Sequence, residues 1–223
     1  MPHRVRVWDL PTRLFHWLLV FSVIGLVITG HVGGNAMNWH ARIGYAVFAL
    51  LLFRIVWGFI GGHWSQFRSF VYGLGSLRAY LGGRAHPDHL VGHSPLGAGS
   101  VFAMLLVLLA QVATGLVGDD EIAFTGPLNR FVSTAAGLRA TWYHKKVGQW
   151  LLVGLVVLHV AAVAWYLRRK RQNLVRPMIV GDKELAAPAR ASRDDLASRG
   201  VALAVLAACA TLVAWVVRAG ATP

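Results

Sequence analysis

Two histidines, His144 and His159, lie fifteen residues apart in one strongly apolar stretch, HKKVGQWLLVGLVVLH. On a helix with a rise of about 1.5 Å per residue they are separated by about 22 Å along the axis, most of the thickness of a bilayer's hydrocarbon core. Fifteen steps of about 100° leave the second histidine about 60° around the axis from the first. Imidazole is a common metal ligand. The spacing therefore predicts two metal cofactors, one near each membrane face, held from the same helix.

The composition indicates a membrane protein. Of the 223 residues, 56% are hydrophobic and 14% are charged, which is too few charges for the surface of a soluble domain of this size. The single cysteine, Cys209, lies in an apolar run, which excludes a disulfide framework and a cysteine-rich metal site. The sequence contains no C-x-x-C-H motif, so any haem in this chain is expected to be held without covalent attachment.

Five apolar stretches are long enough to cross a bilayer as helices. The first follows arginines, as a signal peptide does, but no cleavage site of small residues follows it, so we interpret it as a retained helix. We predict an all-α membrane protein with a four-helix transmembrane bundle in residues 1–175, a cytoplasmic linker in 176–200 and an additional transmembrane helix in 201–223. The expected spans are residues 14–30, 43–61, 96–118, 147–167 and 201–217.

The positive charge is distributed unevenly along the chain. The net charge is +13, and under an alternating topology fifteen of the 22 lysines and arginines lie on one side of the membrane and six on the other. This is the positive-inside pattern, which places the N-terminus in the cytoplasm. The basic run at 168–171 then lies where it meets anionic lipid head groups. Because the topology accounts for the charge, nucleic-acid binding is not expected.

The same topology sorts by depth the histidines that lie in the expected spans or at their ends. An ionisable residue inside a membrane span needs a partner and marks a candidate functional site. His16 and His159 fall near the cytoplasmic side and form an inner pair. His144 falls near the outer side, where either His40 or His31 is available as its partner.

A local repeat favours His40 over His31. His40 and Gly44 share the pattern His-x-x-x-Gly with His144 and Gly148, and His31 has no glycine at that offset. A glycine four residues on lies on the same helix face as the histidine. Its missing side chain leaves room for a flat macrocycle to approach the backbone. We therefore expect His40 to pair with His144 and keep His31 as the alternative.

Two histidines at each depth suit bis-histidine haem better than zinc. A closed zinc site takes four ligands, and the levels of these histidines supply no Cys, Asp or Glu. Haem iron takes two axial ligands, and the second ring nitrogen of each histidine then bonds a carbonyl or side-chain acceptor. The residues available therefore predict two non-covalent haems.

Arg54 is a charged residue inside an expected span. It lies fourteen residues after His40, about 40° from it around a helix axis and towards the cytoplasmic side. A guanidinium there is suited to the propionates of an inner haem, and it is equally able to extend to the lipid head groups. Arg13 is a second candidate for a propionate, and His93 is a candidate for a propionate or a quinone oxygen.

Several motifs in consistent order carry a family resemblance. They are VWDLPTRLFHW, HARIG with FRIVWG, GHSPLG, and QVATGLVGDDEIAFTGPL. Over residues 4–175 the chain resembles the bacterial diheme cytochrome b561 family, nearest to the branch with hydrogenase-type cytochrome b subunits and cytochrome b/b6-domain proteins. The resemblance implies a four-helix core with two b haems that exchanges electrons between a quinone pool and a redox partner. It also implies that the haem ligands are His16, His40, His144 and His159.

The chain departs from that family pattern in the segment that begins with His144. Lys145 stands where family members commonly carry an acidic residue, and the spacing from His144 to His159 is one residue longer than usual. A local change in helix winding would absorb the extra residue. The fifth span lies outside the resemblance.

The predicted function is electron transfer across a bacterial inner membrane. Electrons would pass between the quinone/quinol pool and a redox partner such as a c-type cytochrome or an oxidoreductase subunit. One alternative is a superoxide oxidase that passes electrons to quinone, for which Arg139, Lys145 and Lys146 would attract the anion at the outer haem. The other is a haem-bearing anchor subunit of a larger oxidoreductase.

Overall fold

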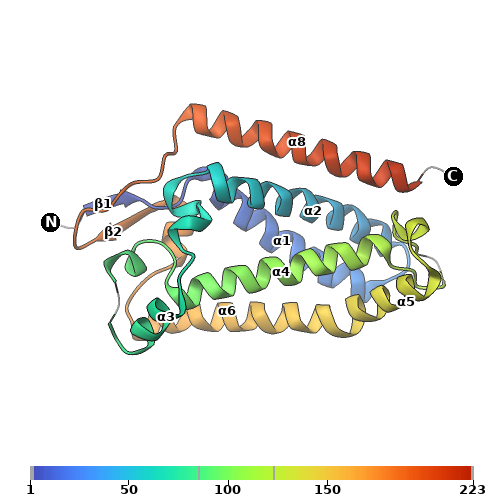
Figure 1. The fold of residues 1–223 in the computed structure, drawn as a ribbon, viewed down its shortest axis with the longest axis horizontal. Coiled ribbons are helices and arrows are strands. Elements are labelled where there is room, and N and C mark those ends of the chain that lie inside the picture. The colour runs from blue at the N-terminus through green and yellow to red at the C-terminus, as the bar shows by residue number, and fades with distance from the viewer. Residues whose placement is uncertain (1–2, 85, 123, 222–223) are drawn as a thin grey trace. The chain divides into compact units, whose positions relative to one another are not determined.

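The computed structural model describes residues 3–84, 86–122 and 124–221, and its regular structure is predominantly helical (Figure 1). Within these residues, five helical stretches are long and apolar enough to cross a membrane. They confirm the prediction of a helical, multi-pass membrane protein with a fifth apolar helix near the C-terminus. The stretches are α1 (Leu10–Val32), α2 (Ala36–Ile60), α4 (Pro95–Val117), α5 (Thr134–Tyr143) continuing into α6 (Gln149–Arg169), and α8 (Leu196–Ala221).

The helices begin earlier than the apolar runs because polar residues cap them. α1 begins at Leu10, four residues before the expected span, since the Asp9 carboxylate accepts a hydrogen bond from Thr12 N at 2.8 Å. α5 begins at Thr134, where the Ser133 hydroxyl accepts from Ala136 N at 3.3 Å. Hydropathy thus locates the spans, and the caps set where the helices start.

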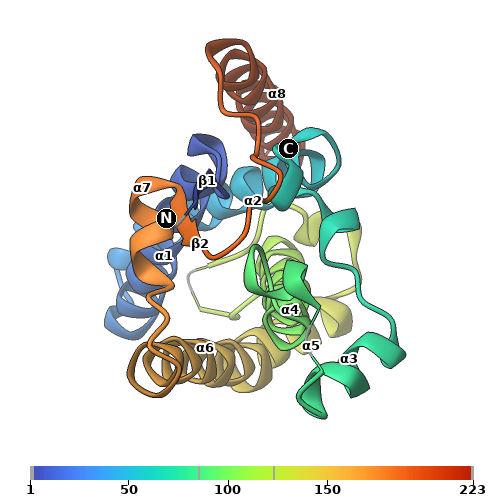
Figure 2. The same cartoon turned by 90° about the vertical axis from the view of Figure 1, so that its left-hand side faces the viewer.

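A short two-stranded ribbon was not predicted. Residues 176–200, expected to be a polar linker, contain the end of α7 (Val175–Val180) and the strand β2 (Asp182–Leu185). β2 pairs antiparallel with β1 (His3–Arg6), as Figure 1 shows, and the end-on view of Figure 2 places α7 beside them. Gly181 makes the turn between α7 and β2 at a φ of 91°, a conformation that favours glycine. A further short helix, α3, covers Leu74–Leu81.

The described chain divides into two compact units, and each long helix contributes a segment to both. The first unit comprises Met1–Phe15, Arg54–Ala103 and Val156–Leu203. The second comprises His16–Phe53, Met104–Leu155 and Ala204–Pro223.

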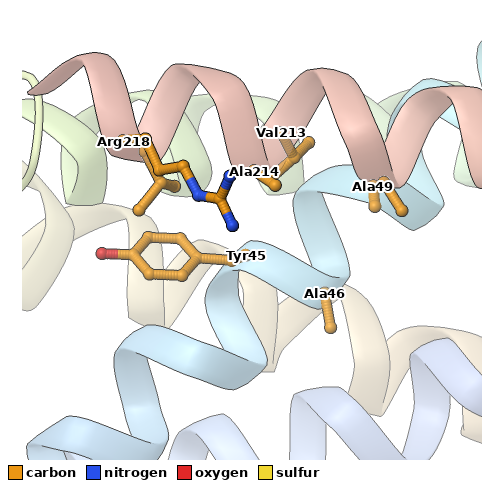
Figure 3. Close-up of a pocket in the computed structure, with 8 residues that line it drawn as sticks. Tyr45, Ala46, Ala49, Val213, Ala214 and Arg218 are labelled. Carbon is orange, nitrogen blue, oxygen red and sulfur yellow. The ribbon is translucent and has the colours of Figure 1, made fainter.

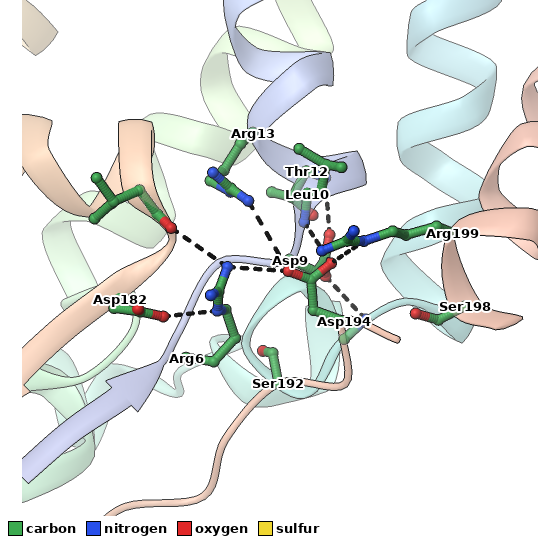
Figure 4. Close-up of polar contacts among 12 residues, drawn as sticks. Arg6, Asp9, Leu10, Thr12, Arg13, Asp182, Ser192, Asp194, Ser198 and Arg199 are labelled. Atoms are coloured by element: carbon green, nitrogen blue, oxygen red, sulfur yellow. Dashed lines mark hydrogen bonds and ion pairs between the residues drawn. The ribbon is translucent and has the colours of Figure 1, made fainter. Parts of the chain in front are cut away.

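A polar junction organises the first unit (Figure 4). The fully buried Asp9 carboxylate also accepts from Trp57 Nε1 at 3.1 Å and from Ser65 Oγ at 2.6 Å, which ties the start of α1 to the end of α2. Asp194 accepts from Arg199 Nε at 3.1 Å and from Leu10 N at 3.0 Å. Burial opposes ionisation of Asp194, but these donors prevail and hold the pKa of its carboxyl below the usual value.

An apolar core holds the second unit together. Leu51 of α2 is fully buried, and it packs in one cluster with Leu108 of α4, Leu152 of α6 and Leu26 of α1. The segment of α8 in this unit lies along α2, and between them is a cavity of about 380 Å³ (Figure 3). Small and apolar side chains make most of its wall, together with Tyr45 and Arg218.

Candidate metal centre

His40 and His144 face each other within the second unit. Their ring centroids are 6.1 Å apart and the ring planes cross at 73°. His40 lies on α2, and His144 begins a five-residue π-helical segment, His144–Gly148, between α5 and α6. Both side chains are partly buried. The structure thus brings together the two histidines that the His-x-x-x-Gly repeat selected.

The separation of the two rings is compatible with two ligands on one metal ion. A metal–imidazole nitrogen bond is about 2 Å long, and a five-membered ring with bonds of about 1.33 Å has a radius of about 1.1 Å. Two such bonds and two such radii place the ring centres about 6 Å apart, against the observed 6.1 Å. The pair therefore fits bis-histidine coordination of a single iron.

The Nδ1 atom of each ring is already engaged. His40 Nδ1 donates to the carbonyl oxygen of Leu26 at 3.0 Å, and His144 Nδ1 donates to that of Gln111 at 2.9 Å. A proton on Nδ1 leaves the lone pair on Nε2, which is the form that binds a metal. The carbonyls also fix the orientation of the rings.

Each ring rests on a Thr-Gly pair of a neighbouring helix. Thr29 Oγ1 lies 3.3 Å from His40 Nδ1, and Thr114 Oγ1 lies 3.3 Å from His144 Nδ1. The glycine that follows each threonine permits the close approach, because a Cβ atom would lie 3.2 Å from the His40 ring at Gly30 and 3.3 Å from the His144 ring at Gly115. We call each set of carbonyl, threonine and glycine a cradle: Leu26, Thr29 and Gly30 for His40, and Gln111, Thr114 and Gly115 for His144.

The two cradles were missed at the level of sequence, although a signal for them exists. The pattern V-x-T-G occurs at 27–30 and again at 112–115, each time near the end of an apolar span. The pattern lies on α1 and α4, which do not carry these two histidines. The spacing of the histidines alone therefore does not reveal it.

His31 lies apart from the pair. It is exposed near the end of α1, where its Nδ1 donates to the carbonyl of Val27 at 2.8 Å and its Nε2 lies 3.3 Å from Gln149 Nε2. The ring that faces His144 is therefore that of His40, and the choice of His40 over His31 as a ligand stays a prediction.

The two glycines of the His-x-x-x-Gly repeat have different surroundings. Apart from its chain neighbours and its own helix backbone, a Cβ atom at Gly44 would have no atom of the described residues within 4 Å, so the space beside it is open. A Cβ atom at Gly148 would lie 2.1 Å from Gln111 Oε1. The Gln111 side chain therefore lies against Gly148, and contact of a macrocycle with either glycine stays a prediction.

His16 and His159 belong to different units. His16 is partly buried on α1, and its ring meets the ring of Trp17 edge-on at 5.1 Å. His159 is partly buried on α6. Their pairing as an inner ligand set stays a prediction.

Arg54 is buried inside the protein. It is 3% exposed, and its Cζ lies 4.7 Å from the centre of the Phe67 ring and 6.0 Å from that of Phe70. The hypothesis that it extends to the lipid head groups is therefore wrong. Its Nη1 has no hydrogen-bond partner within the described residues. A buried guanidinium with a donor to spare fits an anionic group.

The two other candidates also lie in the first unit. Arg13 Nη1 donates to the carbonyl of Ile179 at 2.5 Å, so this guanidinium is used within the protein. His93 packs against Phe70 and Trp8, with ring centroids 4.4 Å and 4.8 Å away. His93 and Arg54 thus share Phe70 as a neighbour.

Comparison with known proteins settles the family. Residues 7–181 match the family model for prokaryotic cytochrome b561. The chain belongs to this family. As a b-type cytochrome, it is a membrane protein that transfers electrons through haem b. The match includes all four predicted ligand histidines and ends before α8.

Relatives of this cytochrome b561 carry a common name. A probable Ni/Fe-hydrogenase B-type cytochrome subunit from Bradyrhizobium diazoefficiens is 28% identical over 216 residues, which cover 81% of this chain and 86% of that protein. One of the same name from Azotobacter vinelandii is 28% identical, covering 79% and 87%. The probable Ni/Fe-hydrogenase 1 B-type cytochrome subunit of Escherichia coli K12 is 25% identical, covering 69% and 80%.

Proposed function

We propose that this cytochrome b561 carries electrons across the membrane through two haems b, one bound by His40 and His144 and the other by His16 and His159. The observation that carries the proposal is the facing pair His40 and His144. Its ring separation fits one iron, and each Nδ1 is turned to a carbonyl so that Nε2 can bind.

Haem b supplies the redox chemistry by accepting and releasing single electrons. The chain's own residues bind and orient it. The carbonyls of Leu26 and Gln111 take the Nδ1 protons, which makes the imidazoles stronger donors and stops the rings from turning. The apolar helices around them keep water away, and a low-dielectric site influences the reduction potential.

Two further residues have places in this proposal. Gly44 leaves open the space beside the helix face of His40, which suits the edge of a macrocycle. Arg54, buried and with Nη1 lacking a partner within the described residues, suits a propionate of the haem at His16 and His159. Loss of its charge is expected to shift the potential of that haem more than that of the other.

We further propose a setting for the electron transfer. The positive-inside pattern supports a bacterial inner membrane with the N-terminus in the cytoplasm. The relatives' name, Ni/Fe-hydrogenase B-type cytochrome subunit, supports a hydrogenase-type oxidoreductase subunit as the redox partner. The quinone pool is then the other end of the path, and neighbouring genes that encode a hydrogenase would support this assignment.

A second candidate function rests on charge beside His144. Lys145 and Lys146 are both exposed and follow this histidine directly, so they favour approach of an anion. Rapid reduction of haem by superoxide in the absence of any partner protein would favour a superoxide oxidase.

The decisive experiment is haem stoichiometry of purified variants. The wild type is expected to hold two haems per chain, and His144→Ala and His159→Ala one each. His31→Ala serves as the control, because this exposed histidine lies outside the facing pair, and it is expected to keep both haems. Full haem content in His144→Ala would overturn the assignment of this site.

A further inference from the structure

Gln111 holds His144 by two separate hydrogen bonds. Its backbone carbonyl accepts from His144 Nδ1 at 2.9 Å, and its side-chain Nε2 donates to the backbone carbonyl of His144 at 3.2 Å. One residue of α4 thus contacts both the ring and the main chain of the histidine. The Oε1 atom of the same side chain is buried and has no hydrogen-bond partner within the described residues, so the bond to His144 is the one that anchors this amide there.

The other cradle lacks this second contact. Leu26 occupies the position of Gln111, three residues before the threonine, and its carbonyl accepts from His40 Nδ1 at 3.0 Å. Its side chain is apolar and packs into the core cluster of Leu51. Leucine has no donor for the backbone carbonyl of His40. The side-chain bond is therefore a feature of the His144 cradle alone.

The main chain also differs between His40 and His144. His40 lies within the regular helix α2, whereas the carbonyl of His144 accepts from Gln149 N, five residues on. A bond to residue i+5 marks a π turn, which accommodates one extra residue in a helix. The segment His144–Gly148 therefore carries one residue more than a regular α-helix takes over the same rise.

Gly148 makes the contact of Gln111 with the π turn possible. A Cβ atom there would lie 2.1 Å from Gln111 Oε1 and 2.9 Å from Tyr143 Cε1. A side chain at this position would push the amide away from the carbonyl of His144. Gly148 and Gln111 therefore act together on the π turn.

We propose that Gln111 is a positioning residue that holds the π turn at His144 and so directs the His144 ring towards the iron despite the extra residue. The inference rests on the proposed haem site at His40 and His144. A second donor to the His144 carbonyl stabilises the wider turn, in which the helix hydrogen bonds are displaced from the ordinary pattern. The ring of His144 then keeps one orientation.

The first test replaces Gln111 with methionine, which fills similar space but has no donor. The backbone carbonyl remains, so both haems should stay bound. Carbon monoxide binds reduced haem only when an axial ligand leaves, and the fraction of carbon monoxide-reactive haem should rise about 10-fold, the scale typical of a lost outer-shell contact. The low-spin electron paramagnetic resonance signal of one haem should shift or broaden.

Leu26→Met is the matched control at the same position of the other cradle. It keeps the backbone carbonyl that accepts from His40 Nδ1 and removes no side-chain donor, so both measurements should change less than in Gln111→Met. If Gln111→Met matches the wild type and Leu26→Met in both measurements, the inference is overturned.

The second test removes the need for the π turn. Deletion of Lys146 shortens the spacing from His144 to His159 to fourteen residues, which an unbroken α-helix accommodates. In that background Gln111→Met should have no further effect on carbon monoxide reactivity. The same increase in both backgrounds would show that Gln111 acts without the π turn and would overturn the inference. If the deletion variant fails to bind haem, the first test decides.

The outcome for His144→Ala separates the two proposals. If His144→Ala retains two haems, the proposed function fails, whatever Gln111→Met shows. If His144→Ala loses one haem and Gln111→Met behaves as the wild type, the site stands and only the role of Gln111 fails.

Discussion

The cradles of His40 and His144 have the same plan and differ in one side chain. Each offers a carbonyl and a threonine hydroxyl to Nδ1, and a glycine beneath the ring. At the carbonyl residue, however, the first has Leu26 and the second Gln111. The polar side chain is found where the main chain is irregular. The comparison teaches that a neighbouring helix adds a polar contact to the main chain at the π turn, and an apolar side chain where the helix is regular.

The largest expected difference between the surroundings of His40 and His144 comes from alanine at the repeat glycines, Gly44 and Gly148. Gly148→Ala places a Cβ 2.1 Å from Gln111 Oε1, and such overpacking costs about 1–3 kcal/mol. Gly44→Ala meets open space, so thermal stability of the haem-free protein should not fall. If a macrocycle lies beside Gly44, the Gly44→Ala variant should lose haem although its haem-free form stays stable. Melting followed by circular dichroism, together with Soret absorbance, measures both effects, and equal loss of stability in the two variants would contradict the comparison.

A smaller effect, equal in the two cradles, is expected when alanine replaces the cradle glycines Gly30 and Gly115. A Cβ at Gly30 or Gly115 comes within 3.2 or 3.3 Å of a ring, so each ring must move by a few tenths of an ångström. The cost should be about 1 kcal/mol in either cradle, with a small shift of the Soret band. A strong effect at one glycine and none at the other would show that the two cradles are not equivalent.

The smallest effect is expected from valine at the cradle threonines. Thr29→Val and Thr114→Val each remove a hydroxyl 3.3 Å from Nδ1, but the carbonyl continues to accept the proton. Each should therefore cost about 0.5 kcal/mol and lower the haem potential only slightly. Redox titration of the two variants measures this. A large shift for either would mean that the hydroxyl, not the carbonyl, is the principal acceptor.

Much of the architecture followed from local patterns. Apolar runs of sufficient length predicted the five spans, and His40 was preferred over His31 because of a glycine four residues on. The β1–β2 ribbon was missed because strands of four residues show too little periodicity to stand out in a basic, proline-containing segment. The sequence leaves the surroundings of Arg54 open, because it gives the depth of this residue along the helix but not which neighbours cover it.

The sequence by itself determined the spans and the spacing of the histidines, because hydrophobicity and helical period act over neighbouring residues. Only the tertiary structure decided that the helix carries a π turn at His144 and which carbonyls receive the Nδ1 protons. Those contacts join residues such as Gln111 and His144, 33 positions apart, and packing of separate helices brings them together. The same packing fills the space at Gly148 and leaves the space at Gly44 open.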